Sequence, residues 1–123
     1  MTKREVYLGA KGEERGIRPP TPATLKKYGM VALDWLELMD EQGWKCPVCL
    51  KRVGVTWNID HAHVPRWKHL PPVERLRFVR GILCAWCNHR RVNSSMSAAE
   101  AQRIADYFKA YETRRNDGTQ TEG

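Results

Sequence analysis

The chain has 123 residues, enough for one domain and too few for two of ordinary size. It carries 21 Lys and Arg against 14 Asp and Glu, and this formal charge of +7 favours a polyanionic partner, either nucleic acid or an anionic membrane. No apolar run approaches the roughly 18 residues that a membrane span needs, and the N-terminus lacks the apolar stretch of a signal peptide. We therefore expect a cytoplasmic protein that does not enter a membrane.

The first part of the chain divides into an arm and a helix. Residues 1–23 are polar and rich in Gly and Pro, which predicts a flexible N-terminal arm. A helix is predicted from about residue 24 to residue 42, because apolar residues recur there at helical spacing and Gly43 is a natural stop. These apolar residues, which we expect in the core, are Tyr28, Ala32, Trp35, Leu36 and Met39.

From Trp44 onward short elements are expected. The alternation of Val55, Trp57 and Ile59 predicts a strand that runs into Asp60. Residues 64–80 are expected to form a basic loop with one helical turn after Pro72. The segment RGILC, residues 80–84, predicts a second strand, and a helix is expected to follow it.

The last element has the clearest boundaries. Ser97 and Glu100 have the spacing of a capping box, and apolar residues continue at helical spacing to about Arg115. This apolar stripe is expected in the core, with a dimer contact as the alternative. Residues 116–123 are predicted to be a disordered tail. The sequence therefore predicts one domain over residues 24–115.

Four cysteines form two Cys-x-x-Cys pairs. Thiols stay reduced in the cytosol, so these cysteines are read as metal ligands rather than disulfides. Each pair can present two thiolates to one tetrahedral zinc ion, and two pairs complete a closed site, which makes the zinc structural. The alternatives are unliganded buried thiols or a redox pair. The four predicted ligands are Cys46, Cys49, Cys84 and Cys87.

A polar cluster lies between the two cysteine pairs. Asp60, His61 and His63 sit where the first strand ends, and Asn88 directly follows the second pair. If zinc holds both ends of the intervening segment, Asp60 and Asn88 can come together, and their oxygen atoms suit Mg²⁺ or Mn²⁺. A neutral histidine beside such an ion can take a proton from water. The cluster therefore indicates phosphodiester hydrolysis.

The cysteine pairs and the polar cluster together resemble the motifs of a known family. The array CPVC…IDHAH…RGILCAWCN, with the preceding LKKYGM…LDWLELMDEQGWKCPVC, resembles the phage recombination endonuclease VII family, within the His-Me finger (ββα-metal, HNH-like) nucleases. The resemblance covers about residues 24–93. It implies an α+β, mainly helical fold, in which a small zinc-stapled ββα-metal core at about residues 44–93 is flanked by N- and C-terminal helices.

The resemblance also implies roles for individual residues. The four cysteines match the structural zinc ligands, and Asp60 and Asn88 match the ligands of the catalytic cation. His61 matches the general base, and His63 matches the accessory histidine near the scissile phosphate. The sequence departs from the family at Ala62, where an aspartate is usual, in the longer loop after His63, and at Arg91, where some relatives carry a carboxylate.

Cations dominate the region around this cluster. Between residues 64 and 93 seven Lys and Arg face a single acid, Glu74, so the region is either a solvated charged face or a set of phosphate contacts. Trp67 is expected to stack on an unpaired base, and Trp86 is expected in the core. The candidate DNA contacts are Arg66, Lys68, Arg75, Arg77, Arg80, Arg90 and Arg91.

Several functions are compatible with these features. The leading hypothesis is a metal-dependent DNA endonuclease, and the resemblance implies selectivity for branched DNA such as four-way junctions. A general HNH-type nicking nuclease and a non-catalytic zinc module that binds nucleic acid are the alternatives, and an adaptor protein is the least favoured. Cutting both strands of a junction needs two active sites, so residues 1–23 and the C-terminal helix are candidate dimer contacts.

Overall fold

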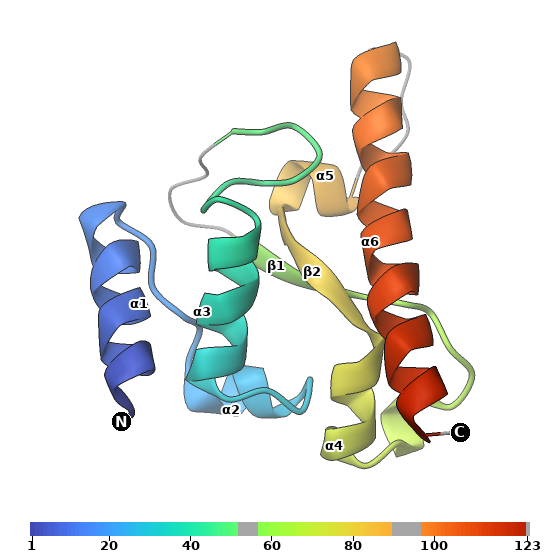
Figure 1. The fold of residues 1–123 in the computed structure, drawn as a ribbon, viewed down its shortest axis with the longest axis horizontal. Coiled ribbons are helices and arrows are strands. Elements are labelled where there is room, and N and C mark those ends of the chain that lie inside the picture. Colours follow the sequence, from blue (N-terminus) through green and yellow to red (C-terminus); the bar gives the residue numbers. More distant parts are fainter. Residues whose placement is uncertain (52–56, 90–96, 123) are drawn as a thin grey trace.

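The computed structural model describes residues 1–51, 57–89 and 97–122, and the fold is α+β and mainly helical, as predicted (Figure 1). Within these ranges no helix is both long enough and apolar enough to cross a membrane. Helices dominate both ends of the chain, and two strands lie between them. The helices are α1 (Lys3–Glu14), α2 (Pro22–Lys26), α3 (Ala32–Glu41), α4 (Pro72–Arg75), α5 (Ala85–His89) and α6 (Ala98–Glu122), with short 3₁₀ turns η1 (Trp67–His69) and η2 (Leu76–Phe78).

The strands β1 (Trp57–His61) and β2 (Val79–Cys84) form an antiparallel pair. Both were predicted, although Val55 lies outside the described residues. The register pairs Asp60 with Gly81 and His61 with Val79, so Arg80 is an extra residue that interrupts the ladder. Such a bulge re-aims a side chain. Here it accompanies the contact of Arg80 with Asp60 that is described below.

The N-terminal segment is not the flexible arm that the sequence predicted. Its residues form α1, which packs against α3 (Figure 1), and Leu8 on α1 is fully buried. Gly12 is a close-packing residue, because a Cβ atom there would lie 3.0 Å from the ring of Trp44. Lys11 also donates to Asp40 of α3 at 2.7 Å. The glycines and prolines suggested a linker, whereas Gly12 in fact allows two segments to approach.

The single helix predicted over residues 24–42 is two helices, α2 and α3. Gly29 lies between them with a φ of 69°, in the left-handed region that glycine adopts without strain. A Cβ atom at this position would lie 1.7 Å from the carbonyl oxygen of Pro72, so the break allows the 28–30 turn to contact the start of α4. Asp34 then accepts a hydrogen bond from the Val31 N–H and starts α3. The predicted core residues of α3, Trp35, Leu36 and Met39, are buried.

Helix α6 begins as predicted and ends later. The Ser97 hydroxyl accepts from the Glu100 N–H at 3.1 Å, and Glu100 accepts from the Ser97 N–H at 3.3 Å, which completes the capping box. The segment predicted to be a disordered tail continues the helix to Glu122. Once a helix is nucleated, each further residue adds one hydrogen bond, so it can extend through poor helix formers.

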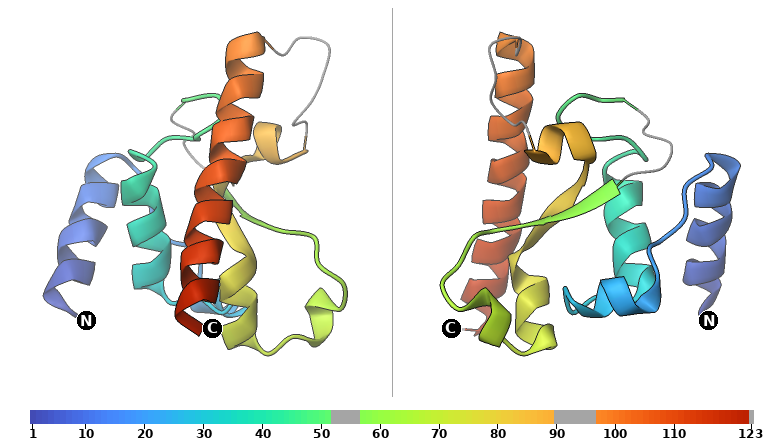
Figure 2. Two further views of the ribbon diagram at one scale, coloured as in Figure 1. Left: turned by 45° about the vertical axis from the view of Figure 1, so that its right-hand side comes forward. Right: turned by 180° about the vertical axis from the view of Figure 1, so that it is seen from behind.

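The buried residues form two clusters. One joins α1, α3 and the sheet around Leu8, Trp35 and Ile82. The other surrounds the cysteines and includes Leu83 of β2 and Ile104 of α6. The apolar stripe of α6 therefore packs within the chain, along β2, as Figure 2 shows from two sides.

Candidate functional site

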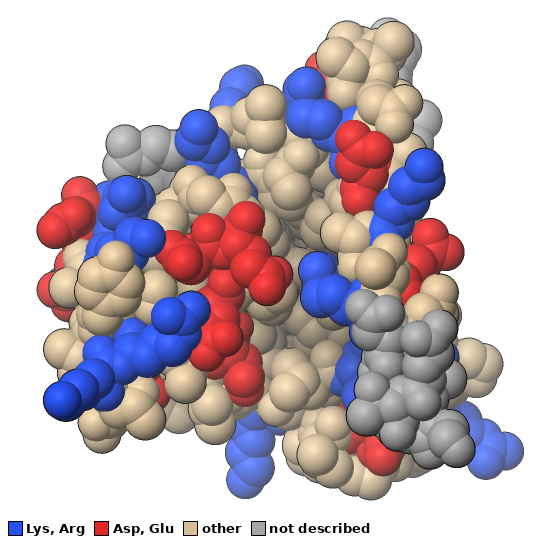
Figure 3. Space-filling view, viewed as in Figure 1, with Lys and Arg blue, Asp and Glu red and all other residues tan. Residues whose placement is uncertain are grey.

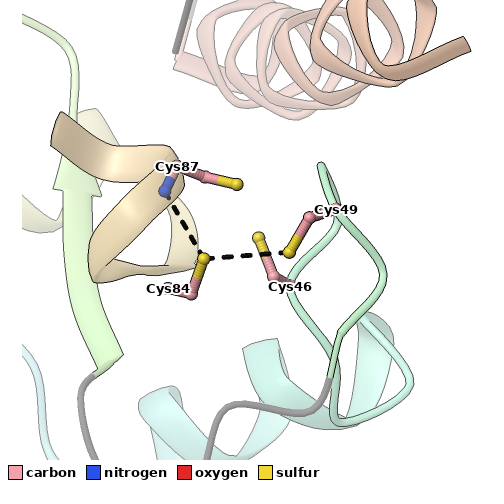
Figure 4. A group of neighbouring side chains, drawn as sticks. All are labelled: Cys46, Cys49, Cys84 and Cys87. Carbon is pink, nitrogen blue, oxygen red and sulfur yellow. Dashed lines mark hydrogen bonds between the residues drawn. The ribbon is translucent and has the colours of Figure 1, made fainter. Parts of the chain in front are cut away.

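The four cysteines form one cluster (Figure 4). Cys46 and Cys49 lie in the turn after α3, Cys84 ends β2, and Cys87 lies in α5. All four sulfur atoms lie within 4.8 Å of one another, and the Sγ atoms of Cys49 and Cys84 are 3.8 Å apart. Sulfurs at the vertices of a tetrahedron about 2.3 Å from a zinc ion are also about 3.8 Å apart. The arrangement fits the predicted zinc.

The electrostatics of the cluster suit a dication. All four cysteines are free thiols. Burial raises the pKa of the Cys49 and Cys87 thiols, and the neighbouring sulfur charges raise it further. Burial also opposes ionisation of Cys46, but backbone N–H groups, first that of Cys49, hold its pKa below the ordinary value. A zinc ion would offset the repulsion between thiolates. With four thiolates the site is closed, so this metal is structural.

Helix α6 helps to hold the first cysteine pair in place. The Leu50 N–H donates to the Cys46 carbonyl at 2.8 Å, with Leu50 in the left-handed conformation, and this closes the turn. The guanidinium of Arg103 on α6 donates to the carbonyl of Val48 at 2.6 Å. The cysteine cluster therefore joins the turn after α3 to the β2–α5 junction, and Arg103 joins α6 to the same turn.

Asp60 is buried near the end of β1. Its side chain is 3% exposed and that of Arg80 is 11% exposed. The Arg80 guanidinium donates to both carboxylate oxygens, at 2.9 and 3.2 Å, and the Tyr107 hydroxyl donates to Oδ2 at 2.8 Å. Burial, and then the charge of Asp60, raise the pKa of Tyr107 far above its usual range, so this hydroxyl keeps its proton. The carboxylate is thus held in one orientation.

His61 lies beyond Asp60 at the end of β1 and has different neighbours. Its Nδ1 atom is 3.0 Å from the Ala62 carbonyl oxygen. A carbonyl oxygen only accepts, so Nδ1 is the donor, and in the neutral ring Nε2 carries the lone pair. The ring stacks on Trp67, with centroids 3.9 Å apart and planes 7° apart, and Tyr28 and His63 lie 5.9 and 5.5 Å away. Nε2 is therefore the basic atom of this ring.

Asn88 and His63 complete the predicted cluster. Asn88 is half-buried on α5, and α5 packs against both strands. The elements that carry Asp60 and Asn88 are therefore neighbours. His63 is exposed beside His61.

Two of the predicted DNA contacts are engaged inside the protein. Arg80 binds Asp60 and lies over the Phe108 ring at 4.7 Å. Arg75 donates to three carbonyl oxygens, those of Leu70, Lys68 and Lys27. Their guanidinium groups hold the fold together, which sequence alone did not indicate. The exposed candidates are Arg66, Lys68 and Arg77, while Arg90 and Arg91 lie outside the described residues.

The two tryptophans of this region lie in different surroundings. Trp67, expected to stack on a base, is half-buried and its ring stacks on His61. Trp86, expected in the core, is 56% exposed on α5. Two site residues were not predicted, Tyr107 and Tyr28. Tyr107 lies 47 residues from its partner Asp60, so no local sequence pattern connects the two.

A small α+β domain that carries a four-cysteine metal cluster is the class that the fold and site define. Residues 22–110, more than half of the chain, match the sequence model of the recombination endonuclease VII family. The chain belongs to the recombination endonuclease VII family, which implies a recombination endonuclease that acts on DNA. The match extends beyond the predicted 24–93 into α6. No curated protein and no solved structure matches the chain.

Proposed function

We propose that the protein is a metal-dependent endonuclease that hydrolyses phosphodiester bonds and prefers branched DNA. In this proposal β1, β2 and α5 form the His-Me finger, and the zinc bound by the four cysteines holds its two ends. The observation that carries the proposal is the state of His61 in a chain of this family. Its Nδ1 donates to the Ala62 carbonyl, which leaves a basic Nε2 at the end of β1.

His61 is the general base. Its Nε2 takes a proton from the water that attacks phosphorus, a step for which the lone pair of a neutral imidazole is suited. The hydrogen bond on Nδ1 fixes the tautomer that this step needs. His63, which is exposed beside the His61 ring, contacts the scissile phosphate in this proposal.

Asp60 and Asn88 hold the catalytic cation. Their oxygen atoms are hard ligands, and they lie on packed elements. Carboxylates that bind metals are commonly hydrogen-bonded by further side chains, and Arg80 and Tyr107 serve Asp60 in this way. When bound, Mg²⁺ or Mn²⁺ would supply Lewis-acid stabilisation of the charge that develops on the phosphate.

DNA approaches the face that carries β1 and the segment after it. Arg66 and Lys68 are exposed and flank Trp67 in the sequence, and Trp67 contacts His61, so both cations belong to the segment that contacts the general base. Seen from behind, β1 lies in front of the other elements (Figure 2, right). On the opposite face, acidic side chains gather in a patch over α3 (Figure 3), and this patch would repel a phosphate backbone.

The test of catalysis is cleavage of supercoiled plasmid by zinc-loaded protein in Mg²⁺ or Mn²⁺. Wild type should cut, and His61→Ala should cut at least about 100-fold more slowly, since general base catalysis contributes about 10²–10⁴-fold. His69→Ala is the matched control, because His69 is an exposed histidine of the same segment and should cut at the wild-type rate. Full activity of His61→Ala, or wild type that binds DNA and cuts none with any divalent metal, would refute the proposal.

The preference for branched DNA is tested with a synthetic four-way junction beside linear duplex and single strand of the same sequence. Faster cutting of the junction is expected. Equal cutting of all three would reduce the function to a general nicking nuclease. The oligomeric state of the active species, measured by light scattering, then decides whether paired cuts come from a homodimer.

A further inference from the structure

We propose that Trp67 is a positioning residue that, together with the Ala62 carbonyl, fixes the imidazole of His61 in one orientation. This inference rests on the proposed role of His61 as general base. Trp67 itself touches no reacting atom in this proposal. It acts through the ring on which it stacks.

Two contacts orient the imidazole ring of His61, and each fixes a different part of its geometry. The indole of Trp67 lies 3.9 Å from the His61 ring and within 7° of parallel, so it sets the plane of the imidazole. A half-turn about the last side-chain bond would preserve that plane but exchange Nδ1 with Cδ2 and Nε2 with Cε1, so the lone pair on Nε2 would point elsewhere. The hydrogen bond from Nδ1 to the Ala62 carbonyl excludes this half-turn. Plane and nitrogen position are thus both specified.

Trp67 is itself held in place. The guanidinium of Arg75 lies 5.8 Å from the centre of the indole, in the geometry of a cation–π contact. The same guanidinium donates to the carbonyl of Lys68 within η1, to that of Leu70 directly after η1, and to that of Lys27 at the end of α2. Arg75 therefore fixes the segment that carries Trp67 against the end of α2.

The aromatic contacts connect these parts. Tyr28 follows Lys27, and its ring lies 5.9 Å from that of His61 and 6.1 Å from that of Trp67. The imidazole therefore lies among rings from two segments that one arginine joins. This accounts for a long loop after β1: the loop returns an indole to the histidine at the end of the strand.

The functional consequence is a precise orientation of the His61 lone pair. A base contributes only while its lone pair faces the proton that it takes, and a misplacement of about 1 Å can cost about 10²-fold in rate. We expect Trp67→Leu to lower kcat by about 10- to 100-fold with little change in KM. Trp67→Phe keeps a stacking ring and should stay within about 3-fold of wild type.

The decisive measurement uses the full, zinc-loaded chain and needs neither DNA nor the catalytic cation. Long-range ¹H–¹⁵N correlation spectra report which nitrogen of a neutral histidine carries the proton. Wild type should show His61 with the proton on Nδ1, and Trp67→Leu should show a mixture of both forms. Val73→Ala is the control, because Val73 is an exposed residue of the neighbouring α4 and should leave the His61 signals unchanged.

The outcomes are separable. Loss of the Nδ1–H form and of kcat in Trp67→Leu, with both kept in Trp67→Phe, supports the proposal. An unchanged His61 signature in Trp67→Leu, or equal losses in the Leu and Phe variants, overturns it. If Trp67→Leu does not fold by circular dichroism, Trp67→Met replaces it. Should wild type cut no DNA, the proposed function fails, while the spectra still show whether Trp67 orients the ring.

Discussion

Replacing Arg80 by methionine should destabilise the protein strongly, although Arg80 looks from sequence like one of several basic surface residues. Methionine keeps much of the apolar stem that lies against Phe108 but removes the charge. Asp60 is then left 3% exposed without its guanidinium partner. Removing one member of a buried ion pair costs about 3–5 kcal/mol, because the remaining charge stays desolvated.

The contacts support that magnitude. Two hydrogen bonds are lost, at 2.9 and 3.2 Å, and bonds to a charged group contribute about 1.5–3 kcal/mol each. The Tyr107 hydroxyl still donates to the carboxylate and stabilises it in part. The loss should therefore stay below the sum of the two hydrogen-bond contributions. We therefore expect a decrease of about 3–5 kcal/mol in the free energy of unfolding.

Urea unfolding followed by circular dichroism, at one fixed concentration of free zinc, measures this change. Arg77→Met is the matched control. Arg77 is exposed and its bond to Glu74 is 3.4 Å long, so at most about 1 kcal/mol should be lost. Adding Asp60→Asn to Arg80→Met should restore part of the stability, because the buried group is then neutral. A loss below about 1 kcal/mol in Arg80→Met, or no restoration in the double variant, would refute the reasoning.

Three further outcomes are expected. Gly29→Ala should lower the free energy of unfolding in urea by roughly 2–5 kcal/mol, because of the left-handed backbone and the clash with Pro72. Gly16→Ala, at a φ of 70° with open space around it, should lower it by only about 1–2 kcal/mol. Serine in place of any of the four clustered cysteines should abolish zinc retention, measured by metal analysis after dialysis, and equal zinc content would contradict the site. Asp40→Asn should lose about 1–2 kcal/mol at pH 7. Hydrogen bonding from Lys11 lowers the pKa of Asp40. The stability difference between wild type and Asp40→Asn should therefore be present above about pH 4 and vanish as the pH falls through the lowered pKa. A constant difference down to about pH 2 would contradict this.

Local patterns predicted the parts of the fold whose causes are local. The spacing of Cys46 and Cys49 reflects the geometry of a tight turn, and Ser97 and Glu100 satisfy each other's backbone N–H groups within one helical turn. The second strand was predicted from a short apolar run for the same reason. Such features depend on residues a few positions apart.

The errors share a different cause, which is contact between distant segments. Gly29 breaks a continuous helical pattern because the backbone at Pro72 approaches it. No residue near position 29 indicates this contact in the sequence. In the same way Gly12 looked like part of a linker until Trp44 was found against it. A glycine in a sequence indicates freedom of the backbone, and only the fold shows whether that freedom is used to turn or to pack closely.

The basic residues show why charge alone predicts a site poorly. Three arginines lie close together in one segment, Arg75, Arg77 and Arg80. Only Arg77 of these three is exposed. A guanidinium has five donors, so it can bind carbonyls or a carboxylate inside the protein as readily as phosphate outside it. Arg75 binds backbone carbonyls beside Trp67, and Arg80 binds the carboxylate of Asp60.

These two internal arginines give the proposed site its organisation. Asp60 and His61 are adjacent in sequence but have separate supports: Arg80 and Tyr107 for the carboxylate, Trp67 and the segment fixed by Arg75 for the imidazole. Each support comes from outside β1, one from β2 and α6 and the other from the loop after β1. A cation ligand and a base in one nuclease must hold positions relative to the same phosphate, and independent supports allow each to be set without disturbing the other. The match to the recombination endonuclease VII family extends into α6, the helix from which Tyr107 reaches Asp60.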